Sequence, residues 1–580
     1  MRKKVIAFLL LFALTVVSLA GCGKQEETDK KKDTTADAGG QNSDQADSEQ
    51  KGSESSNKAD LQQGDQEQAD PDGQAPEEGS SAQTNPYTFP LAEKAELSVW
   101  LAWGNDYIED PNDLISIQEF EKNTNVHINW VYVGSTEASE KFGLMMASGN
   151  YPDIIRGADA YYTGGVATAV QDGVFVELTD YIDTYMPNYR ALRESNPEIK
   201  RATTTDDGRV VAVYTLACDD KEVTGEAQWV GMAVRRDWLE DVNQEVPITI
   251  EDWHTMLTAF KEEKGCQAPL LIAGDGVDLP GHFLSAYGVG PEFYRVDGQV
   301  HYGPAEEGYR EYLELFHTWY EEGLIDKNFV TNDAAMNPPF DVIGTGGAGA
   351  TCMIWPFTTD YFHTMGYNDE EDFYMVGVPS PVLTEGDTAY NFFNTRAITK
   401  ETVCISNNCK DVGLALSWID YLYSDEGYYL NNYGVENDTY VINADGIPEF
   451  TENVTNDPEH AGLEKLAFYT LSQSSFGKYN WTLMGKAWSG TDQLLCEEVW
   501  DLDSDERQLP PSMSMTEEES YQYASIYTDI KTLVDEMTVK FITGTEALSR
   551  YDTFVQNLYE HGLQTCIDIQ QAAYERYMNR

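Results

Sequence analysis

The sequence predicts an α/β fold organised in two lobes. Strand-like and helix-like segments alternate along the chain from Ala95 onward, which is typical of α/β architecture. The 486 residues from Ala95 to Arg580 exceed what one hydrophobic core usually serves. We therefore expect two cores, and we find no short-period internal repeat that would indicate a solenoid.

The alternation is clearest at the start of this region. Residues 97–101 form a short apolar run typical of a buried strand, and residues 126–133 predict a second strand. Between them, residues 115–123 carry one apolar stripe at helical spacing, with Ile117 and Phe120 on the buried side. The sequence thus predicts a strand, a helix and a second strand.

Two later helices have clear signatures. Thr249 and Asp252 have the spacing of a capping box, which predicts a helix that begins at residue 250. Its apolar positions recur at helical spacing: Trp253, Met256, Leu257 and Phe260. The terminal helix has one face formed by Cys566, Ile569, Ala573 and Tyr577. Because they lie on such amphipathic patterns, four tryptophans are assigned to the core: Trp238, Trp253, Trp319 and Trp418.

The first 22 residues carry an export signal. Arg2, Lys3 and Lys4 precede an apolar run, residues 5–17, that is too short to cross a bilayer as a mature helix. The run ends at Leu19-Ala20-Gly21-Cys22, which resembles the bacterial lipoprotein signal. This resemblance implies that residues 1–21 are cleaved and that the Cys22 thiol carries a lipid. An ordinary secretory signal with a chance cysteine is the alternative.

Residues 22–94 predict a disordered tether. Between Gly23 and Pro86 the only large apolar residue is Leu61, so the segment cannot bury enough surface to fold. A flexible coil of the 72 residues 23–94 has a root-mean-square span of about 45–50 Å. The folded body is therefore expected to stand off the membrane.

The folded body is strongly acidic. The signal carries 3 basic residues, and the tether carries 7 basic and 17 acidic residues, which leaves 28 basic and 82 acidic residues from Ala95 onward. A surface near −54 repels phosphate backbones and anionic lipid headgroups, so nucleic-acid binding and membrane binding through a basic patch are disfavoured. Most of this charge is sufficiently explained by solubility.

Six segments carry a resemblance to a known family: residues 146–154, 181–188, 235–253, 319–326, 419–427 and 569–577. In this order along the chain they resemble the extracellular solute-binding proteins of ABC importers, in particular the LplA-like branch associated with oligosaccharide and glycoside uptake. The first of them, Met-Ala-Ser-Gly-Asn-Tyr-Pro-Asp-Ile, is similar to the family's LASGDYPDII segment. One departure lies at Gly434 to Asn437, where the family often has GG-x-EG and this chain has Asn437 in place of a second glycine. Asn tolerates left-handed backbone, so we expect the turn to survive.

The resemblance implies a two-lobe periplasmic-binding-protein-like fold of type II, with several hinge crossings and the ligand cleft between the lobes. We place lobe 1 at residues 95–228 plus 378–425 and lobe 2 at residues 229–377 plus 426–580. It also implies a monomer that closes on a carbohydrate and is recognised by a membrane permease, with no catalysis, cofactor or metal.

We predict ligand-binding residues among aromatic and polar side chains that follow strands or flank loops, and from the resemblance to the family. Trp103 and Asp106 follow the first strand, Trp355 ends another, and Trp481 and Trp488 flank the loop at Gly485. Asp159 and Arg235 are polar candidates near strand ends, and Glu436 is carried over from the resemblance. Aromatic rings stack on the apolar side of a sugar, while carboxylates and guanidinium groups bind its hydroxyls.

Several enzyme-like or metal-like motifs fail their structural tests. Residues 344–349 fit G-x-G-x-x-G but precede a strand-like run, so they predict a glycine-rich turn. Asp501, Asp503 and Asp505 have the spacing of a calcium loop, but Glu506 replaces its glycine and Ser512 its bidentate Glu, which disfavours calcium. The eight histidines include no H-x-x-x-H and the cysteines no C-x-x-C. Cys404 and Cys409 are close enough in sequence for one small disulfide loop.

Three alternatives stay open. The same fold can bind a solute other than a sugar, and it can present its ligand to a sensor kinase instead of a permease. A secreted glycoside-active enzyme is also compatible with an acidic, aromatic-rich lipoprotein, since two carboxylates suffice for glycoside hydrolysis.

Overall fold

The structure is a computed structural model, and it describes residues from Thr84 to Arg580 with gaps. The gaps are residues 104–107, 220–221, 226–227, 229, 273–280, 333–339, 355–358, 360–361, 364–365, 369, 371, 393–397, 445, 456–462, 472–475, 484–495 and 497. All described residues belong to one compact unit. Cys22, Asp106, Trp355 and Trp488, four of the predicted functional residues, lie outside the described residues.

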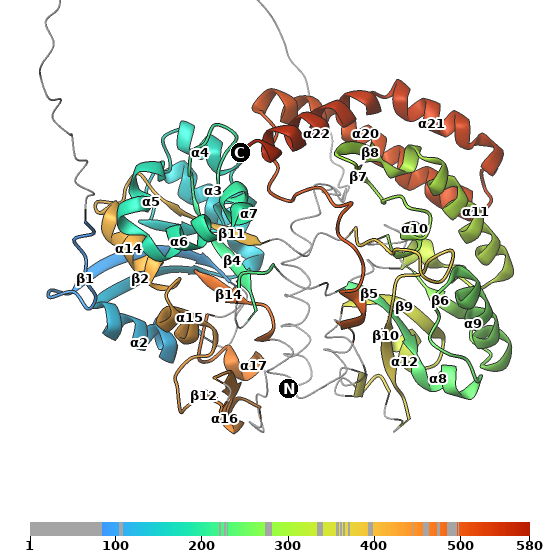
Figure 1. The fold of residues 1–580 in the computed structure, drawn as a ribbon, viewed down its shortest axis with the longest axis horizontal. Coiled ribbons are helices and arrows are strands. Elements are labelled where there is room, and N and C mark those ends of the chain that lie inside the picture. The colour runs from blue at the N-terminus through green and yellow to red at the C-terminus, as the bar shows by residue number, and fades with distance from the viewer. Residues whose placement is uncertain are drawn as a thin grey trace, which may run out of the picture. The chain divides into compact units, whose positions relative to one another are not determined.

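The first sheet has six strands in the order β14-β4-β11-β3-β1-β2 (Figure 1). Its strands are β1 (Ala95–Ala102), β2 (Val126–Val133), β3 (Ile154–Arg156), β4 (Val213–Cys218), β11 (Thr399–Ile405) and β14 (Lys478–Asn480). β1 pairs in parallel with β2 over its whole length, from Ala95 opposite Val126 to Ala102 opposite Val133. The two strands and the intervening helix predicted at the start of the body are confirmed.

The second sheet has four strands in the order β10-β5-β9-β6. Its strands are β5 (Val230–Arg235), β6 (Ala268–Leu271), β9 (Ala348–Ile354) and β10 (Met375–Val378). Two further antiparallel pairs are β7 (Phe293–Val296) with β8 (Gln299–Tyr302) and β12 (Tyr440–Ile442) with β13 (Pro448–Phe450). The two large sheets confirm the α/β class with two lobes.

Helices alternate with the strands of each sheet along the chain. Those in the segments of the first sheet are α2 (Ile115–Thr124), α3 (Ala138–Ser148), α4 (Gly165–Gln171), α5 (Thr179–Tyr185), α6 (Pro187–Ser195), α7 (Pro197–Ala202), α14 (Val412–Tyr421) and α15 (Asp425–Asn432). The others are α8 (Arg236–Asp241), α9 (Ile250–Glu263), α10 (His282–Ser285), α11 (Glu307–Glu322), α12 (Phe340–Gly344), α16 (Glu452–Thr455), α17 (Leu463–Leu466), α20 (Glu517–Ile542), α21 (Tyr551–Glu560) and α22 (Leu563–Met578). None of the helices in the described parts of the chain has the length and apolar character needed to cross a bilayer.

Several sequence-level details are confirmed. Thr249 and Asp252 form a reciprocal capping box at the start of α9. The four tryptophans assigned to the core are at most 7% exposed: Trp238, Trp253, Trp319 and Trp418. The glycine-rich turn joins α12 to β9, with Gly346 at a φ of 80°. This helix-to-strand order is the reverse of a dinucleotide-binding motif.

One predicted detail is wrong. Cys404 and Cys409 are both free thiols, so they do not form the small disulfide loop.

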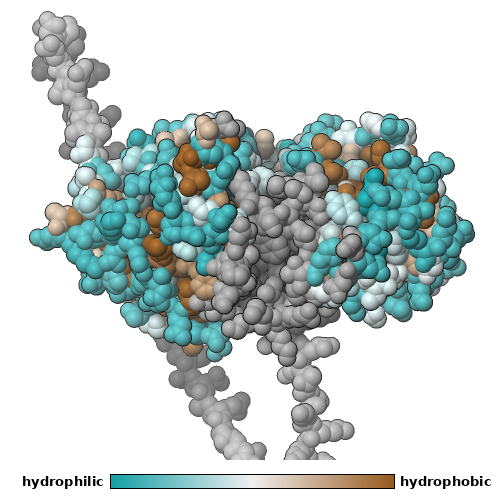
Figure 2. Space-filling view, turned by 90° about the horizontal axis from the view of Figure 1, so that it is seen from below, coloured by the Kyte–Doolittle hydropathy of each residue, from teal (hydrophilic) through white to brown (hydrophobic). Residues whose placement is uncertain are grey.

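Two of the apolar cores each belong to one sheet, and a third cluster contains residues of both sheets. One core joins the second sheet to α9, α11 and the long C-terminal helices, through residues such as Phe260, Phe316, Phe541 and Cys566. Another joins the first sheet to α2, α5 and α14, through residues such as Phe120 and Trp418. Among the residues coloured by hydropathy in Figure 2, hydrophilic ones predominate and hydrophobic ones form patches.

In the described parts of the chain, the polypeptide passes from one lobe to the other three times: after β4, after β10 and after β14. After the third passage, Trp500 packs on Gly231 of β5. The exact lobe boundaries stay a prediction, but some segments pair differently from the predicted bounds. β14 and α15, which were predicted in lobe 2, pair and pack with elements of the first sheet. Val382, which was predicted in lobe 1, bridges to Thr249 beside the second sheet.

The end of the predicted tether is docked on the first lobe. Tyr87 donates its hydroxyl to Asp411 at 2.7 Å, and the backbone N–H of Leu91 donates to the carbonyl of Thr124 at 3.0 Å. Phe89 meets the ring of Tyr421 edge-on. Apolar residues resume at Tyr87, which explains why this part of the predicted tether packs although the preceding composition cannot.

Gly231 provides a test of the packing between Trp500 and the second sheet. A Cβ atom at Gly231 would lie 2.3 Å from the Trp500 indole, whose Nε1 donates to the carbonyl of Met232 at 2.9 Å. We expect Gly231→Ala to lower the free energy of unfolding by about 1–3 kcal/mol through overpacking. Gly143→Ala in α3 is the control, because its Cβ meets nothing within 4 Å. The control should be stabilised by about 0.5–1 kcal/mol in chemical denaturation. Equal effects at the two glycines would contradict this packing.

Candidate functional site: the carboxyl edges of the two sheets

Strand direction gives the first sheet one functional edge. β1, β2, β3, β4 and β14 run in the same direction and β11 runs against them. The carboxyl ends of five strands therefore share one edge with the amino end of β11. Trp103 follows β1, Asp159 follows β3 and Trp481 follows β14, so the structure brings three of the predicted ligand residues to this edge. In open α/β sheets this is the edge where ligands bind.

Trp103 contributes mainly to the core at this edge. Its side chain is 8% exposed and meets the ring of Tyr132 edge-on, with the ring centroids 6.4 Å apart. Its backbone N–H donates to the carbonyl of Val133 at 2.9 Å and so continues the pairing of β1 with β2. A ligand contact from Trp103 stays a prediction, and little of its ring is left for one.

Asp159 fastens the turn after β3 to β11. Its Oδ1 accepts hydrogen bonds from the backbone N–H of Thr402, at 3.1 Å, and from the Thr402 hydroxyl. The N–H of Gly157 in turn donates to the Thr402 carbonyl at 2.7 Å. Asp159 is nevertheless exposed as a residue, so a carboxylate is held in a fixed orientation at the edge.

Trp481 is the most suggestive of the predicted residues. Its backbone N–H donates to the carbonyl of Cys218 at 3.2 Å, which continues the pairing of β14 with β4. The indole is half-buried, and its Nε1 is shielded from water without a hydrogen-bond partner among the residues that the structure describes. A buried donor left unpaired costs about 1–3 kcal/mol. An acceptor supplied by a ligand would remove this cost.

A buried amide holds the turn that carries Trp481. Asn480 is fully buried, and its Oδ1 accepts from the N–H and the hydroxyl of Thr482 at 2.9 and 2.8 Å. Its Nδ2 donates to the hydroxyls of Tyr428 and Tyr433 at 2.7 and 3.1 Å. Both tyrosines belong to α15 or its end, so the site residue is fixed to the segment that leads to Glu436.

Glu436 lies in the turn where the family motif departs. Asn437 adopts a left-handed φ of 66°, as predicted for an asparagine in place of glycine. Its N–H donates to the carbonyl of Tyr440 at 2.7 Å, which closes the turn. Burial, with the nearby Glu436 carboxylate, raises the pKa of Tyr440 to about 12. A ligand contact from Glu436 stays a prediction.

Arg235 lies apart from the other predicted residues. β5 runs antiparallel to β6, β9 and β10. The carboxyl end of β5, where Arg235 lies, is therefore at the edge of the second sheet opposite the carboxyl ends of the other three strands. The Arg235 residue is 3% exposed, and its guanidinium pairs with Asp237 and lies over the rings of Trp238 and Phe373 at 4.7 and 4.4 Å. These contacts give Arg235 a structural role in the second lobe.

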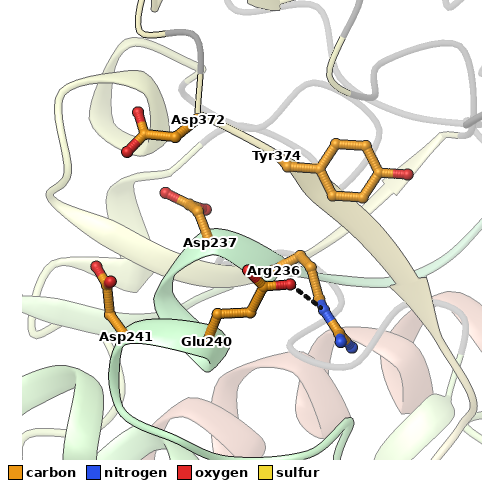
Figure 3. A pocket seen from close by; sticks show the side chains of 6 residues that line it. All are labelled: Arg236, Asp237, Glu240, Asp241, Asp372 and Tyr374. Carbon is orange, nitrogen blue, oxygen red and sulfur yellow. Dashed lines mark hydrogen bonds and ion pairs between the residues drawn. The ribbon is translucent and has the colours of Figure 1, made fainter.

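A shallow pocket of about 320 Å³ lies beside Arg235 (Figure 3). It is lined by Arg236, Asp237, Glu240, Asp241, Asp372 and Tyr374. Arg236 is paired with Glu240 at 3.2 Å, and the remaining charged groups are carboxylates. The pocket is at the edge opposite the carboxyl ends of β6, β9 and β10, so it is separate from the candidate site. Across the described parts of the chain, no group of three or more His, Cys, Asp or Glu side chains is placed to hold a metal ion.

The second sheet has a carboxyl edge of its own, at the ends of β6, β9 and β10 and the start of β5. His282 follows β6 and Ser380 follows β10, and the His282 Nδ1 lies 2.6 Å from the Ser380 hydroxyl. His282 is 2% exposed, and burial lowers its pKa to about 3. Sequence reasoning missed this pair because a lone histidine and a serine almost a hundred residues apart show no motif.

The connections between the sheets use these same two edges. The chain leaves β4, β10 and β14 at their carboxyl ends, and it enters β5 and β11 at their amino ends. Two α/β lobes joined by several crossings at their carboxyl edges define a two-lobe solute-binding protein. The chain belongs to the bacterial extracellular solute-binding protein family, whose model matches residues 113–429, more than half of the chain.

Two curated relatives extend this similarity. The fructooligosaccharide ABC transporter substrate-binding protein FusA of Streptococcus pneumoniae is 25% identical over 517 residues, which cover 84% of this chain and 92% of FusA. Lipoprotein LipO of Bacillus subtilis is 27% identical over 382 residues, which cover 62% of this chain and 71% of LipO.

Solved structures share the fold. FusA in complex with kestose aligns with a TM-score of 0.62 at 21% identity, over 83% of this chain and 99% of that structure. The alginate-binding protein AlgQ2 without calcium ion aligns with a TM-score of 0.62 at 22% identity, over 84% of this chain and 99% of that structure.

His282 makes the stability of the second lobe depend on pH. Its pKa in the folded protein is about 3, below the ordinary 6.5, so the unfolded chain binds the proton more readily. Stability should therefore fall as the pH falls below 6.5, by about 2 kcal/mol between pH 7.5 and pH 5 from this residue. Urea unfolding of protein lacking residues 1–22 should show this loss, and His282→Gln should lack it. The control His561→Gln, at the exposed end of α21, should retain the loss. A slope in His282→Gln equal to that of the wild type would refute this assignment.

Proposed function

We propose that this protein is the substrate-binding subunit of an ABC importer, and that it captures an oligosaccharide or glycoside between the carboxyl edges of its two sheets. The observation that carries the proposal is the match with FusA over 92% of that protein's length, because FusA is named for fructooligosaccharide. The bound solute would be passed to the transmembrane permease subunits of the importer. A solute other than a sugar, or delivery to a sensor kinase, is the alternative within the same fold.

The chemistry at the first carboxyl edge suits a neutral polyhydroxylated ligand. Trp481 offers an indole face and an unsatisfied Nε1–H, and Asp159 offers an oriented carboxylate acceptor. An aromatic face covers the apolar side of a sugar ring, while a carboxylate accepts from its hydroxyls. The acidic body disfavours an anionic ligand, which the chain's net charge of −61 would repel.

We expect no turnover of the bound solute. Binding and release require only that the lobes move about their connections, which needs no nucleophile or paired acid and base. The competing hypothesis of a glycoside-active enzyme predicts cleavage of the same ligand. The two hypotheses therefore differ in whether the ligand is recovered unchanged.

A ligand screen tests the proposal. Protein lacking residues 1–22 is heated with fructooligosaccharides, alginate oligosaccharides and N-glycan fragments, and with peptides and amino acids for comparison. We expect one glycan to raise the midpoint, with about 2.7 kcal/mol of stabilisation at a hundredfold excess over its dissociation constant. That glycan should be recovered intact. Cleavage would favour the enzyme, and a response to peptides alone would overturn the carbohydrate assignment.

The same assay, with the glycan found, resolves the role of Trp481. Trp481→Phe keeps a ring but removes the donor, so we expect roughly fivefold weaker binding from one lost hydrogen bond of about 1 kcal/mol. Trp481→Ala removes the ring as well and should weaken binding further. Tyr521→Ala on α20, where the side chain is 81% exposed, is the matched aromatic control and should bind normally. Unchanged affinity in both Trp481 variants would remove this residue from the site.

We also propose that the mature chain is lipid-anchored through Cys22 on the outer face of the bacterial membrane and acts as a monomer. The lipobox at Leu19 to Cys22 supports this proposal. Full-length protein expressed in bacteria should incorporate labelled palmitate and fractionate with membranes. Cys22→Ala should lose both properties, and labelling that persists in this variant would contradict anchoring at Cys22.

A further inference from the structure

The final helix α22 contacts both lobes. Its inner face belongs to the core of the second sheet, where Leu563 and Cys566 are fully buried. Near its end, two arginines bind one carboxylate of the first lobe. Arg576 Nε lies 2.9 Å from Asp206 Oδ2, and Arg580 Nε lies 2.7 Å from Asp206 Oδ1.

Asp206 is firmly part of the first lobe. It lies in the turn between α7 and β4, which is closed by a hydrogen bond from the N–H of Thr205 to the carbonyl of Arg209 at 2.9 Å. α7 in turn packs on α6, and β4 is a strand of the six-stranded sheet. Asp206 thus belongs to the first lobe, whereas the two arginines that pair with its carboxylate oxygens follow or belong to α22, which packs in the core of the second sheet.

The two arginines are held in place from the side of the second lobe. Arg576 binds both oxygens of Glu519, the third residue of α20 and its half of the capping box with Thr516, at 2.9 and 2.6 Å. Burial would raise the pKa of Glu519, but hydrogen bonds from Arg576 and Thr516 keep this pKa below its usual value. Arg580 donates through Nη1 to the carbonyl of Ser512 at 2.9 Å. The guanidinium groups are thus preorganised for Asp206.

A second set of contacts lies beside the carboxylate. The Tyr577 ring is 2% exposed and has the guanidinium of Arg201, from α7, at 5.7 Å and that of Arg580 at 4.9 Å from its centroid. Its hydroxyl donates to Glu198 of α7 at 3.2 Å. The Arg580 side chain is only 3% exposed, so its charge depends on the Asp206 carboxylate for compensation.

We propose that the pairing of Asp206 with Arg576 and Arg580 is a latch that restrains the movement of the two lobes in the solute-free protein. At the crossings the lobes also share an apolar cluster, in which Cys218 and Tyr428 of the first lobe are grouped with Val230 of the second. The contact at Asp206 joins the lobes at a separate point, through charges. Rotation that separates α22 from α7 must break the two ion pairs and expose the Arg580 guanidinium. The latch makes the range of lobe positions depend on one carboxylate.

Distance measurements between the lobes test the latch. Spin labels on unnatural amino acids replace Leu144 in α3 and Tyr559 in α21, two exposed sites on different lobes. In solute-free protein, Asp206→Asn should broaden the distribution of label distances or shift its mean by more than about 2 Å.

The neighbouring residue supplies a matched control. Asp207 is also a carboxylate, but its partner Arg209 belongs to the same turn, so Asp207→Asn should leave the distances unchanged. Arg580→Gln should reproduce the effect of Asp206→Asn, and the double variant should add nothing to it. Far-ultraviolet circular dichroism shows whether each variant is folded. Unchanged distances in folded Asp206→Asn and Arg580→Gln, or an equal change in Asp207→Asn, would overturn the proposal. Because no solute is present, these results do not depend on which ligand the protein binds.

Discussion

The direction of the strands determines where this protein is able to bind a solute. After each parallel strand the chain must cross back to the other end of the sheet before the next parallel strand begins. The loops that follow parallel strands therefore lie at a single edge. In both sheets the antiparallel members, β11 and β5, are the strands that receive the chain from the other lobe. Their reversed direction lets a connection pass from one carboxyl edge to the other without crossing a sheet. The candidate site and the connections between the lobes therefore result from the same constraint.

Much of the architecture could be predicted because it depends on local pattern. The strands at residues 97–101 and 126–133, the helix between them and the capping box at Thr249 all have short-range signals that the structure confirms. The docking of Tyr87 to Leu91 and the membership of β14 in the first sheet had no such signal. Tyr87 and β14 have partners hundreds of residues away, and a strand of three residues shows too little periodicity to be recognised.

The candidate site shows the same limit. Trp103, Asp159 and Trp481 lie at one edge of the first sheet because each follows a strand of the same direction. Arg235 also follows a strand, but β5 is antiparallel, and nothing in the residues of a buried apolar strand indicates which way it runs. Two further features could not be predicted because they depend on tertiary burial. Local sequence does not show that Trp103 is buried in the core or that His282 pairs with Ser380.

The docked segment at Tyr87 to Leu91 has a mechanical consequence. It runs into β1 at Ala95, the amino end of that strand, which is the edge of the first sheet opposite the candidate site. Any tension in the preceding chain would be transmitted to α2 and α14 through Leu91 and Tyr87, and not to the second sheet. A chain anchored at its start would thus hold one lobe as the fixed body. The other lobe would be the moving part, and the mouth of the site would point away from the point of attachment.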